Sequence, residues 1–493
     1  MALIPLQLPP GVHRNGTDFE SSNRWRDASL VRWHDGSMRP VGGWTVRKSS
    51  AFASAPRAML SYLDNNSAEH LIAGTFNKLY YVNPSQTVYD LTPTSGFTSG
   101  TLSGAINTGF GGGFYGSTNY GSAPTSSGVY SEATTWSLDT WGEYLLAVSS
   151  TDGKLLEWQG NTGVKAQTVS NAPTGNNAMV VTEERFVFCL GAGGNPRKVQ
   201  WSDKENNTVW SASATNEAGD MELQTTGQIM CGLRMRGSTL ILTDNDAHIA
   251  EYSGPPFVYG FQRVGTACGV ASRKAAVAID QGAFWMGKKG FFTFDGSTAK
   301  EMPCEVADYV FDDLNTAQKT KVYAVHNSQF GEIWWFYPSG SSNENDRYVT
   351  LDYKEGHWAT GTLDRTAAVD QGVFTNPIFA DASGNLYNHE TGYTHGSVKP
   401  FAESGPISLG NGDNIMKVTS LIPDERVQGE VKVTFKTRLH PNASEINHGE
   451  VVLTNPTDVR FQGRQVRMKV QGAGNTNWRS GVMRVEATPG GRR

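Results

Sequence analysis

Charged residues are scarce in this chain, because Lys, Arg, Asp and Glu make up only 18% of its 493 residues, against roughly 25% in an ordinary soluble protein. The net charge of −5 is small, which argues against a nucleic-acid-coating protein and against an acidic tail. Long apolar runs are also missing, since no stretch approaches the ~18 residues of a membrane-spanning helix. Residues 1–6 have neither the basic start nor the apolar core of a signal peptide. We therefore expect a soluble chain made in the cytosol, without a membrane-spanning segment.

Cysteine is rare as well. The four cysteines are Cys189, Cys231, Cys268 and Cys304. None belongs to a Cys-x-x-Cys pair or to a His/Cys pattern with metal-ligand spacing, so they predict neither a zinc site nor a disulfide framework. We interpret them as buried free thiols in a reducing compartment.

Helical periodicity is nearly absent. The one candidate helix covers residues 304–313, where Val306, Tyr309 and Val310 recur at helical spacing. In place of helix formers the chain has 55 glycines and 13 tryptophans, a composition that favours short strands joined by many turns. We therefore expect an all-β protein.

A loose repeat runs through residues 56–400. Its unit is an apolar strand, a turn with Asp, Asn or Gly, and then an aromatic strand. The clearest copies are 70–83, 144–159, 239–254, 283–296 and 377–390. Spacing near 40 residues with several strands per unit is typical of β-propeller blades, so the repeat predicts a propeller of about six to eight blades. Each blade would bury its faces against its neighbours around a central axis.

Two other regions flank the predicted propeller. Residues 1–55 are expected to form an N-terminal arm with a hairpin, whose two-residue turn is Asp35-Gly36. Residues 401–493 alternate cleanly between apolar and polar residues, which predicts a β-sandwich-like C-terminal domain. The expected architecture is thus arm, propeller (56–400) and sandwich.

The propeller carries one long Gly-rich insertion, residues 91–131, which contains no charged residue. Two interpretations stay open for it. It is either a flexible loop, since it cannot bury enough aliphatic surface for its own core, or a β-loop that packs on another subunit. The aromatic residues that would make the inter-subunit contact are Phe110, Phe114, Tyr115 and Tyr120.

The C-terminal strands are basic, because residues 426–493 hold twelve Lys or Arg against five Asp or Glu. On 429–439, Val433 and Phe435 point to one side and the basic residues to the other. The candidate residues for a partner-facing basic surface are Lys432, Lys436, Arg438, Arg467 and Lys469.

The candidate metal-binding and catalytic motifs in the sequence lack residues or spacings that their chemistry requires. His389-Glu390 with His395 superficially looks like a zinc-protease helix, but the second histidine comes too late and the intervening residues disfavour a helix. Asp244 and Asp246 lack the later Gly and Glu of a calcium-binding loop. We therefore predict no catalytic, cofactor-binding or metal-binding residues, no cofactor, and no enzymatic activity. The tryptophan clusters are interpreted as blade packing, not as sugar platforms.

Four segments together resemble a known family: 23–44, 109–121, 135–159 and 463–493. They resemble bacteriophage structural proteins, and the family looks similar to the tail hub or nozzle proteins of short-tailed phages. The resemblance implies a propeller-centred subunit in a homo-oligomeric ring, commonly a hexamer. Such a ring would continue the DNA channel below the head-to-tail adaptor, retain packaged double-stranded DNA without sequence specificity, and anchor tail fibres or spikes. The protein would be made in the bacterial host cytoplasm and reside in the virion tail.

DNA must slide through such a channel, and each phosphate neutralised by a cation would hold it back. We therefore expect a neutral or acidic lumen, with the basic strands facing a partner protein or the outer surface. Two alternatives remain: a propeller that binds host glycans through exposed Trp and Tyr, and a carbohydrate-degrading enzyme of the virion.

Overall fold

The computed structural model describes residues 2–106, 130–280, 282–409 and 414–491. Its described α-helix is α1 (Ala307–Asp312), inside the segment expected to be helical, which confirms that prediction. Three short 3-10 helices accompany it: η1 (Asp18–Ser21), η2 (Ala192–Gly194) and η3 (Thr316–Lys321). Within the described ranges, we find no helix with the length and apolar character needed to cross a bilayer.

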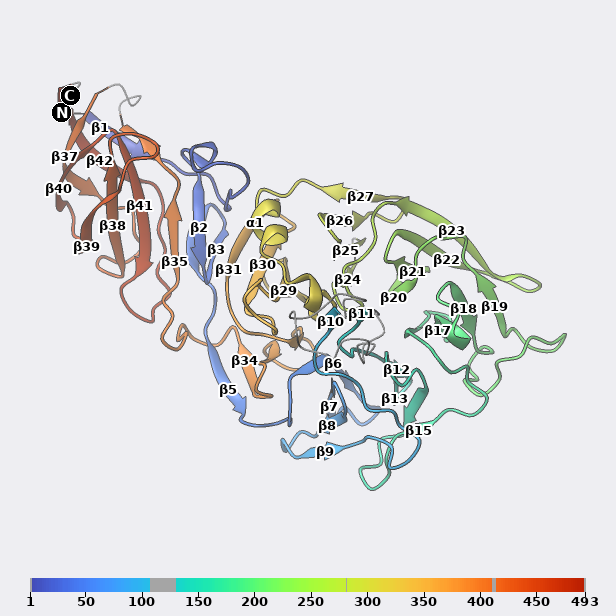
Figure 1. Ribbon diagram of the computed structural model, residues 1–493. Helices are drawn as coiled ribbons and strands as arrows, with labels where there is room; N and C mark the ends of the chain where they lie inside the picture. Colours follow the sequence, from blue (N-terminus) through green and yellow to red (C-terminus); the bar gives the residue numbers. More distant parts are fainter. Residues whose placement is uncertain (1, 107–129, 281, 410–413, 492–493) are drawn as a thin grey trace, which may run out of the picture.

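Seven four-stranded antiparallel sheets of the described chain form the blades of a β-propeller (Figure 1). The first strands contact one another in chain order and the seventh contacts the first, so the ring closes around an axis. These first strands are β6 (Pro56–Leu63), β12 (Trp136–Trp141), β16 (Ala178–Val181), β20 (Ile229–Met235), β24 (Ala276–Ile279), β28 (Tyr323–Asn327) and β32 (Ala367–Val369). The predicted propeller is therefore confirmed, with a blade number inside the expected range.

The outer strands follow in order within each blade. The second strands are β7 (Glu69–Thr75), β13 (Tyr144–Ser149), β17 (Val187–Leu190), β21 (Ser238–Thr243), β25 (Gly282–Met286), β29 (Glu332–Tyr337) and β33 (Ile378–Ala380). The third strands are β8 (Leu79–Val82), β14 (Leu155–Trp158), β18 (Lys198–Trp201), β22 (Asp246–Gly254), β26 (Phe291–Phe294), β30 (Arg347–Asp352) and β34 (Leu386–His389). The fourth strands of blades 1 to 6 are β9 (Val88–Asp90), β15 (Gln167–Thr168), β19 (Gly219–Glu222), β23 (Val258–Thr266), β27 (Ala299–Met302) and β31 (His357–Thr362).

Tryptophans fill the spaces between blades, as the sequence predicts. Trp136, Trp285 and Trp335 are fully buried. Trp136 donates its indole N–H to the carbonyl of Thr75 in the preceding blade at 2.5 Å, and the other two donate to preceding backbone carbonyls at 2.7 and 3.0 Å. A Cβ on Gly74 would lie 2.4 Å from the Trp136 ring, so glycine is required there for the blades to approach. Each large ring thus buries apolar surface while its one polar group stays hydrogen-bonded.

The seventh blade takes its fourth strand from the N-terminal segment. Strand β5 (Trp44–Lys48) pairs antiparallel with β34, from Leu386 opposite Lys48 to His389 opposite Trp44. The sequence placed the start of the propeller at residue 56, whereas the structure brings 44–48 into it. Strand β5 is the outermost strand of this blade, so the two ends of the propeller segment meet in one sheet.

The second domain is a β-sandwich, as expected. One sheet has the order β1-β42-β37-β40 and the other β2-β35-β41-β38-β39, with β36 paired to β41. Figure 1 shows it at one end of the molecule. Its strands are β1 (Ala2–Leu6), β2 (Trp25–Ser29), β35 (Phe401–Ser404), β36 (Ile407–Ser408), β37 (Met416–Ile422), β38 (Val431–Arg438), β39 (Ile446–Val452), β40 (Thr457–Gly463), β41 (Gln465–Gly472) and β42 (Met483–Pro489).

The N-terminal segment therefore belongs to every part of the molecule. Strand β1 pairs with β42 in one sheet of the sandwich, and β2 pairs with β35 in the other. The expected hairpin follows as β3 (Val31–His34) and β4 (Ser37–Pro40), and its turn has positive φ at Asp35 (51°) and Gly36 (72°), which confirms the predicted turn. Strand β5 then closes the propeller.

A buried guanidinium fastens the hairpin to two blades. Arg32 on β3 is only 4% exposed, and it binds Glu332 of blade 6 at 2.8 and 2.9 Å. It also binds Glu390, which follows β34 of blade 7, at 2.6 and 3.1 Å. Burial raises the pKa of Glu332, the positive charge of Arg32 opposes this rise, and repulsion from the Glu390 carboxylate adds to it. Arg32 thus connects the hairpin to blades 6 and 7.

We expect Arg32→Met to lower the free energy of unfolding by about 3–5 kcal/mol, because it leaves two buried carboxylates without their cation. Urea unfolding followed by tryptophan fluorescence measures the loss. Arg185→Met is the matched control, since Arg185 is half exposed and pairs with Glu205 at 3.9 Å, and it should cost less than about 1 kcal/mol. Equal losses for the two variants would contradict the role assigned to Arg32.

Candidate functional site

The histidines that superficially suggest a zinc protease hold the seventh blade together. His389 stacks on Phe379 with ring centroids 4.1 Å apart and on Trp44 at 5.3 Å. Its Nε2 accepts a hydrogen bond from Arg365 at 3.0 Å, and burial lowers the pKa of His389 well below its usual range. His395 donates to a backbone carbonyl at 2.8 Å. Both imidazoles are committed to packing and hydrogen bonding inside the fold.

The Asp244 and Asp246 pair likewise serves local turns. Asp246 is buried and accepts hydrogen bonds from the hydroxyls of Thr225 at 2.8 Å and Thr243 at 2.5 Å. Asp244 accepts the backbone N–H of Gln228 at 2.8 Å. These carboxylates tie blade 4 to the loop that precedes it, and Asp244 also pairs with Lys288 at 3.5 Å.

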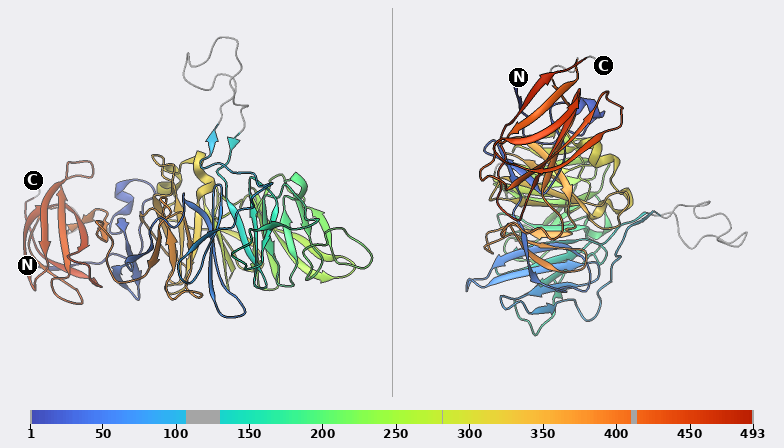
Figure 2. Two further views of the ribbon diagram at one scale, coloured as in Figure 1. Left: turned by 90° about the horizontal axis from the view of Figure 1, so that it is seen from below. Right: turned by 90° about the vertical axis from the view of Figure 1, so that its left-hand side faces the viewer.

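The insertion is anchored on the face of the propeller that also carries α1 (Figure 2). Its described ends form a small ladder of β10 (Ala105–Ile106) and β11 (Tyr130–Ser131). The four aromatic residues predicted to contact another subunit, Phe110, Phe114, Tyr115 and Tyr120, lie outside the described residues. The structure therefore describes how the two ends of the insertion are attached to the propeller.

One arm of the insertion is held by side chains from blades 1 and 6. The Gln318 amide donates to the carbonyl of Gly104 at 2.8 Å and accepts its N–H at 3.0 Å. The Lys321 ammonium donates to Ser103 at 3.1 Å, and the Arg57 guanidinium donates to the carbonyl of residue 102 at 3.2 Å. The other arm is held by Glu132, which forms an ion pair of 2.6 Å with the buried Arg273, just before blade 5. The foot of the insertion is thus fixed on both sides.

Glu344 balances the two cations at this foot. It binds Arg57 at 2.6 and 2.7 Å and Lys321 at 2.8 Å, and both cations have almost fully buried side chains. Burial lowers the pKa of Lys321 to about 8, and the neighbouring Arg57 charge adds to this shift. Burial alone would raise the pKa of Glu344, but its bonds to Arg57 and Lys321 outweigh burial and hold it below its ordinary value. The sequence could not reveal this cluster, since Arg57 and Glu344 are 287 residues apart.

The lysines predicted to face a partner lie on the second sheet of the sandwich, and each has a partner in its own chain. Lys432 pairs with Glu450 at 2.5 Å, and Lys436 pairs with Glu403 at 2.7 Å. The Lys469 ammonium lies 4.1 Å from the ring centroid of an aromatic residue on β35. Carboxylates of the same sheet therefore neutralise Lys432 and Lys436, whereas Lys469 keeps its charge and contacts an aromatic ring.

The two predicted arginines are compensated as well. Arg438 is buried and binds Asp18 of η1 at 2.8 Å. Arg467 binds Asp18 too, and it pairs with Glu445 at 2.8 Å. Burial alone would raise the pKa of Asp18, but Arg467 and Arg438 outweigh burial and lower it. Clean alternation predicted which face these residues occupy, but the neutralising carboxylates come from distant segments.

A polar cleft of about 980 Å³ lies between the N-terminal arm, α1 and β31. Its walls carry the ion pairs Arg14–Asp27 at 2.8 Å and Arg347–Asp313 at 3.1 Å. The Arg14 guanidinium also stacks on Tyr309 at 3.5 Å from the ring centroid. A charged ligand entering this cleft would have to compete with these pairs.

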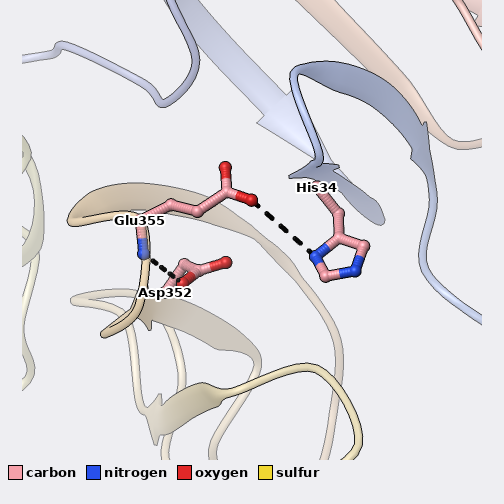
Figure 3. Close-up of side chains that lie close together, drawn as sticks. All are labelled: His34, Asp352 and Glu355. Atoms are coloured by element: carbon pink, nitrogen blue, oxygen red, sulfur yellow. Dashed lines mark hydrogen bonds and ion pairs between the residues drawn. The ribbon is translucent and has the colours of Figure 1, made fainter.

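One set of side chains in the described ranges has metal-ligand geometry. His34, Asp352 and Glu355 each offer a donor atom, and these atoms lie within 4.8 Å of one another. Figure 3 shows His34 at the end of β3, Asp352 at the end of β30 and Glu355 in the turn that follows. The sequence predicts no metal site here. His34 and the two carboxylates are some 320 residues apart, so no local spacing pattern connects them.

The fold places the chain among the β-propellers, with a sandwich added. No family model and no curated protein matches it. Among solved structures, virginiamycin B lyase from Staphylococcus aureus has 7% identity and a TM-score of 0.43, covering 70% of this chain and 98% of the lyase. The Pan2 WD40 domain of Neurospora crassa has 10% identity and a TM-score of 0.38, covering 72% and 95%. Identities and scores this low support no inference about function.

We expect Glu344→Gln to lower the free energy of unfolding by about 3 kcal/mol or more at pH 7, because two buried cations lose their anion. The pKa of Glu344 is lowered in the folded state, so its stabilisation is complete above the ordinary value of 4.5 and is lost as pH falls through the folded value. Urea unfolding at pH 7 and pH 4 should therefore show a difference from wild type that shrinks in acid. Glu205→Gln, an exposed carboxylate, serves as the control. A difference independent of pH would refute the assignment.

Proposed function

We propose that this chain is a structural, non-enzymatic subunit of a bacteriophage tail, the hub or nozzle type of short-tailed phages. It would assemble as a ring below the head-to-tail adaptor and carry fibres or spikes. The observation that carries the proposal is the path of residues 2–48, which contribute a strand to each sheet of the sandwich and to the seventh blade. The resemblance of segments 23–44, 135–159 and 463–493 to phage structural proteins points the same way.

The path of the N-terminal segment suits a part that bears load. A force that pulls the sandwich away from the propeller would act on the pairing of β2 and of β5, and on the buried Arg32 between them. All of these must yield before the domains separate, whereas domains joined by one exposed linker move apart freely. A tail component has to withstand the pressure of packaged DNA, so such a connection is of use there.

The basic strands of the sandwich are expected to lie away from the DNA channel. DNA would be retained by unpaired cations along its path. Four of the five basic residues on β38 and β41 pair with carboxylates of the chain, and the Lys469 ammonium packs on an aromatic ring. We therefore expect this sheet to face a partner protein or the outer surface, and neutral or acidic segments to line the lumen.

The glycan-binding alternative finds little support. It requires Trp or Tyr side chains exposed on one face of the propeller. All thirteen tryptophans lie in the described ranges, and each is buried or half-buried. The tyrosines whose burial is described are likewise buried or half-buried. Stacking on a sugar ring needs an accessible aromatic face, which these residues do not offer.

The proposal is tested by native mass spectrometry and electron microscopy of the full chain, alone and with the adaptor protein of the same virion. We expect a closed ring, and we expect serine at Phe110, Phe114, Tyr115 and Tyr120 to abolish it without lowering the melting temperature of the monomer. Phe257→Ser is the matched control, because Phe257 is 80% exposed on a hairpin of blade 4.

A chain that stays monomeric at tens of micromolar, alone and with the adaptor, would contradict the proposal. So would its absence from the proteins of purified virions. If the ring forms but the serine variant assembles as well as wild type, the tail role stands and the insertion is not the contact.

A further inference from the structure

We infer that His34, Asp352 and Glu355 form a binding site for a divalent transition-metal ion of the zinc class, at the junction of the N-terminal hairpin and blade 6. One imidazole nitrogen and two carboxylate oxygens are donors that zinc accepts, whereas magnesium and calcium prefer oxygen ligands alone. The inference is independent of the proposed function, and either can fail without the other.

The donors are close to the arrangement that a zinc ion needs. His34 Nδ1 lies 3.9 Å from Glu355 Oε1, and all donor atoms are within 4.8 Å of one another. Zinc holds such atoms about 2.0–2.2 Å from itself, so ligands of one tetrahedron lie somewhat closer together than these. Closing the remaining gap requires the exposed Glu355 side chain to rotate, which would change its hydrogen bond with the Asp35 N–H.

Both carboxylates are held in place by backbone groups. One oxygen of Asp352, Oδ1, accepts the N–H groups of Lys354 at 2.9 Å and Glu355 at 2.8 Å. Figure 3 shows its other oxygen turned toward His34. Glu355 Oε1 accepts the N–H of Asp35 at 3.0 Å, across from the hairpin. Asp352 is 5% exposed, so it is fixed by packing as well.

The histidine has the outer partner that metal-bound histidines usually have. His34 Nε2 lies 3.4 Å from the Asp35 carboxylate, while Nδ1 faces Glu355. A carboxylate on the far nitrogen fixes the tautomer and turns the near nitrogen into a better ligand. The ring also packs edge-on against Phe330 at 6.0 Å between centroids.

Electrostatics favour a cation at this place. Asp35, Asp352 and Glu355 bring three carboxylates together, and the nearby guanidinium of Arg32 is taken by two other carboxylates. A second imidazole, His357, stands 3.9 Å from the remaining oxygen of Glu355. A bound ion would join the hairpin to the β30–β31 turn, next to the point where Arg32 enters blade 6. Its role would be structural, reinforcing the junction between the N-terminal segment and the propeller.

The test uses the full chain stripped of metal with a chelator and titrated with zinc alone, by calorimetry and by thermal unfolding. We expect saturable binding of one ion per chain, with a melting temperature that rises with zinc and not with magnesium. His34→Gln, Asp352→Asn and Glu355→Gln should each weaken binding by at least about tenfold. The two carboxylate variants keep an oxygen for the backbone bonds, so the fold is preserved.

His440→Gln, an exposed histidine in the sandwich, is the matched control and should bind zinc as wild type does. X-ray absorption at the zinc edge should then show one nitrogen and at least two oxygens at zinc–ligand distances. Zinc binding too weak to detect at roughly 100 µM, the range of weak extracellular calcium sites, overturns the inference. So does binding that the three variants leave unchanged.

Discussion

Closure of the ring by the N-terminal segment is the constraint on which the rest of this structure depends. The seven sheets stack around an axis, and β5 adds residues 44–48 as the outermost strand of the last one. The segment before β5 supplies a strand to each sheet of the sandwich, so one continuous segment connects both domains. The buried Arg32 stabilises the point where these paths meet, because it binds carboxylates of blades 6 and 7 together.

The buried charges, like the N-terminal segment, connect parts of the chain that are far apart in the sequence. The few charges that lie inside the fold are placed in clusters whose cations and anions come from distant segments, such as Arg57, Lys321 and Glu344 below the insertion. Buried pairs of this kind add little net stability, but removing one member costs much. They therefore specify how segments meet. In a subunit that would have to keep its shape under load, such specificity matters more than the number of contacts.

Local patterns in the sequence predicted the elements, and long-range pairing decided the rest. Repeats between 56 and 400 predicted the blades, Asp35-Gly36 predicted the hairpin turn, and the alternation of Val433 and Phe435 predicted the buried face of β38. The joining of β1 and β2 to the sandwich could not be predicted, because short alternating strands fit either sheet. The same holds for the ion pairs of Arg467 and for the donors around His34, which meet only when distant turns are brought together.

Native-state hydrogen exchange of the full chain, read by mass spectrometry, tests the central claim most directly. If the N-terminal segment closes the fold, the amides of β2 and β5 should exchange as slowly as those of β34 and β41, through one common unfolding event. Exchange of 25–48 within minutes, while the blades and the sandwich stay protected for hours, would show an appended arm and contradict the account.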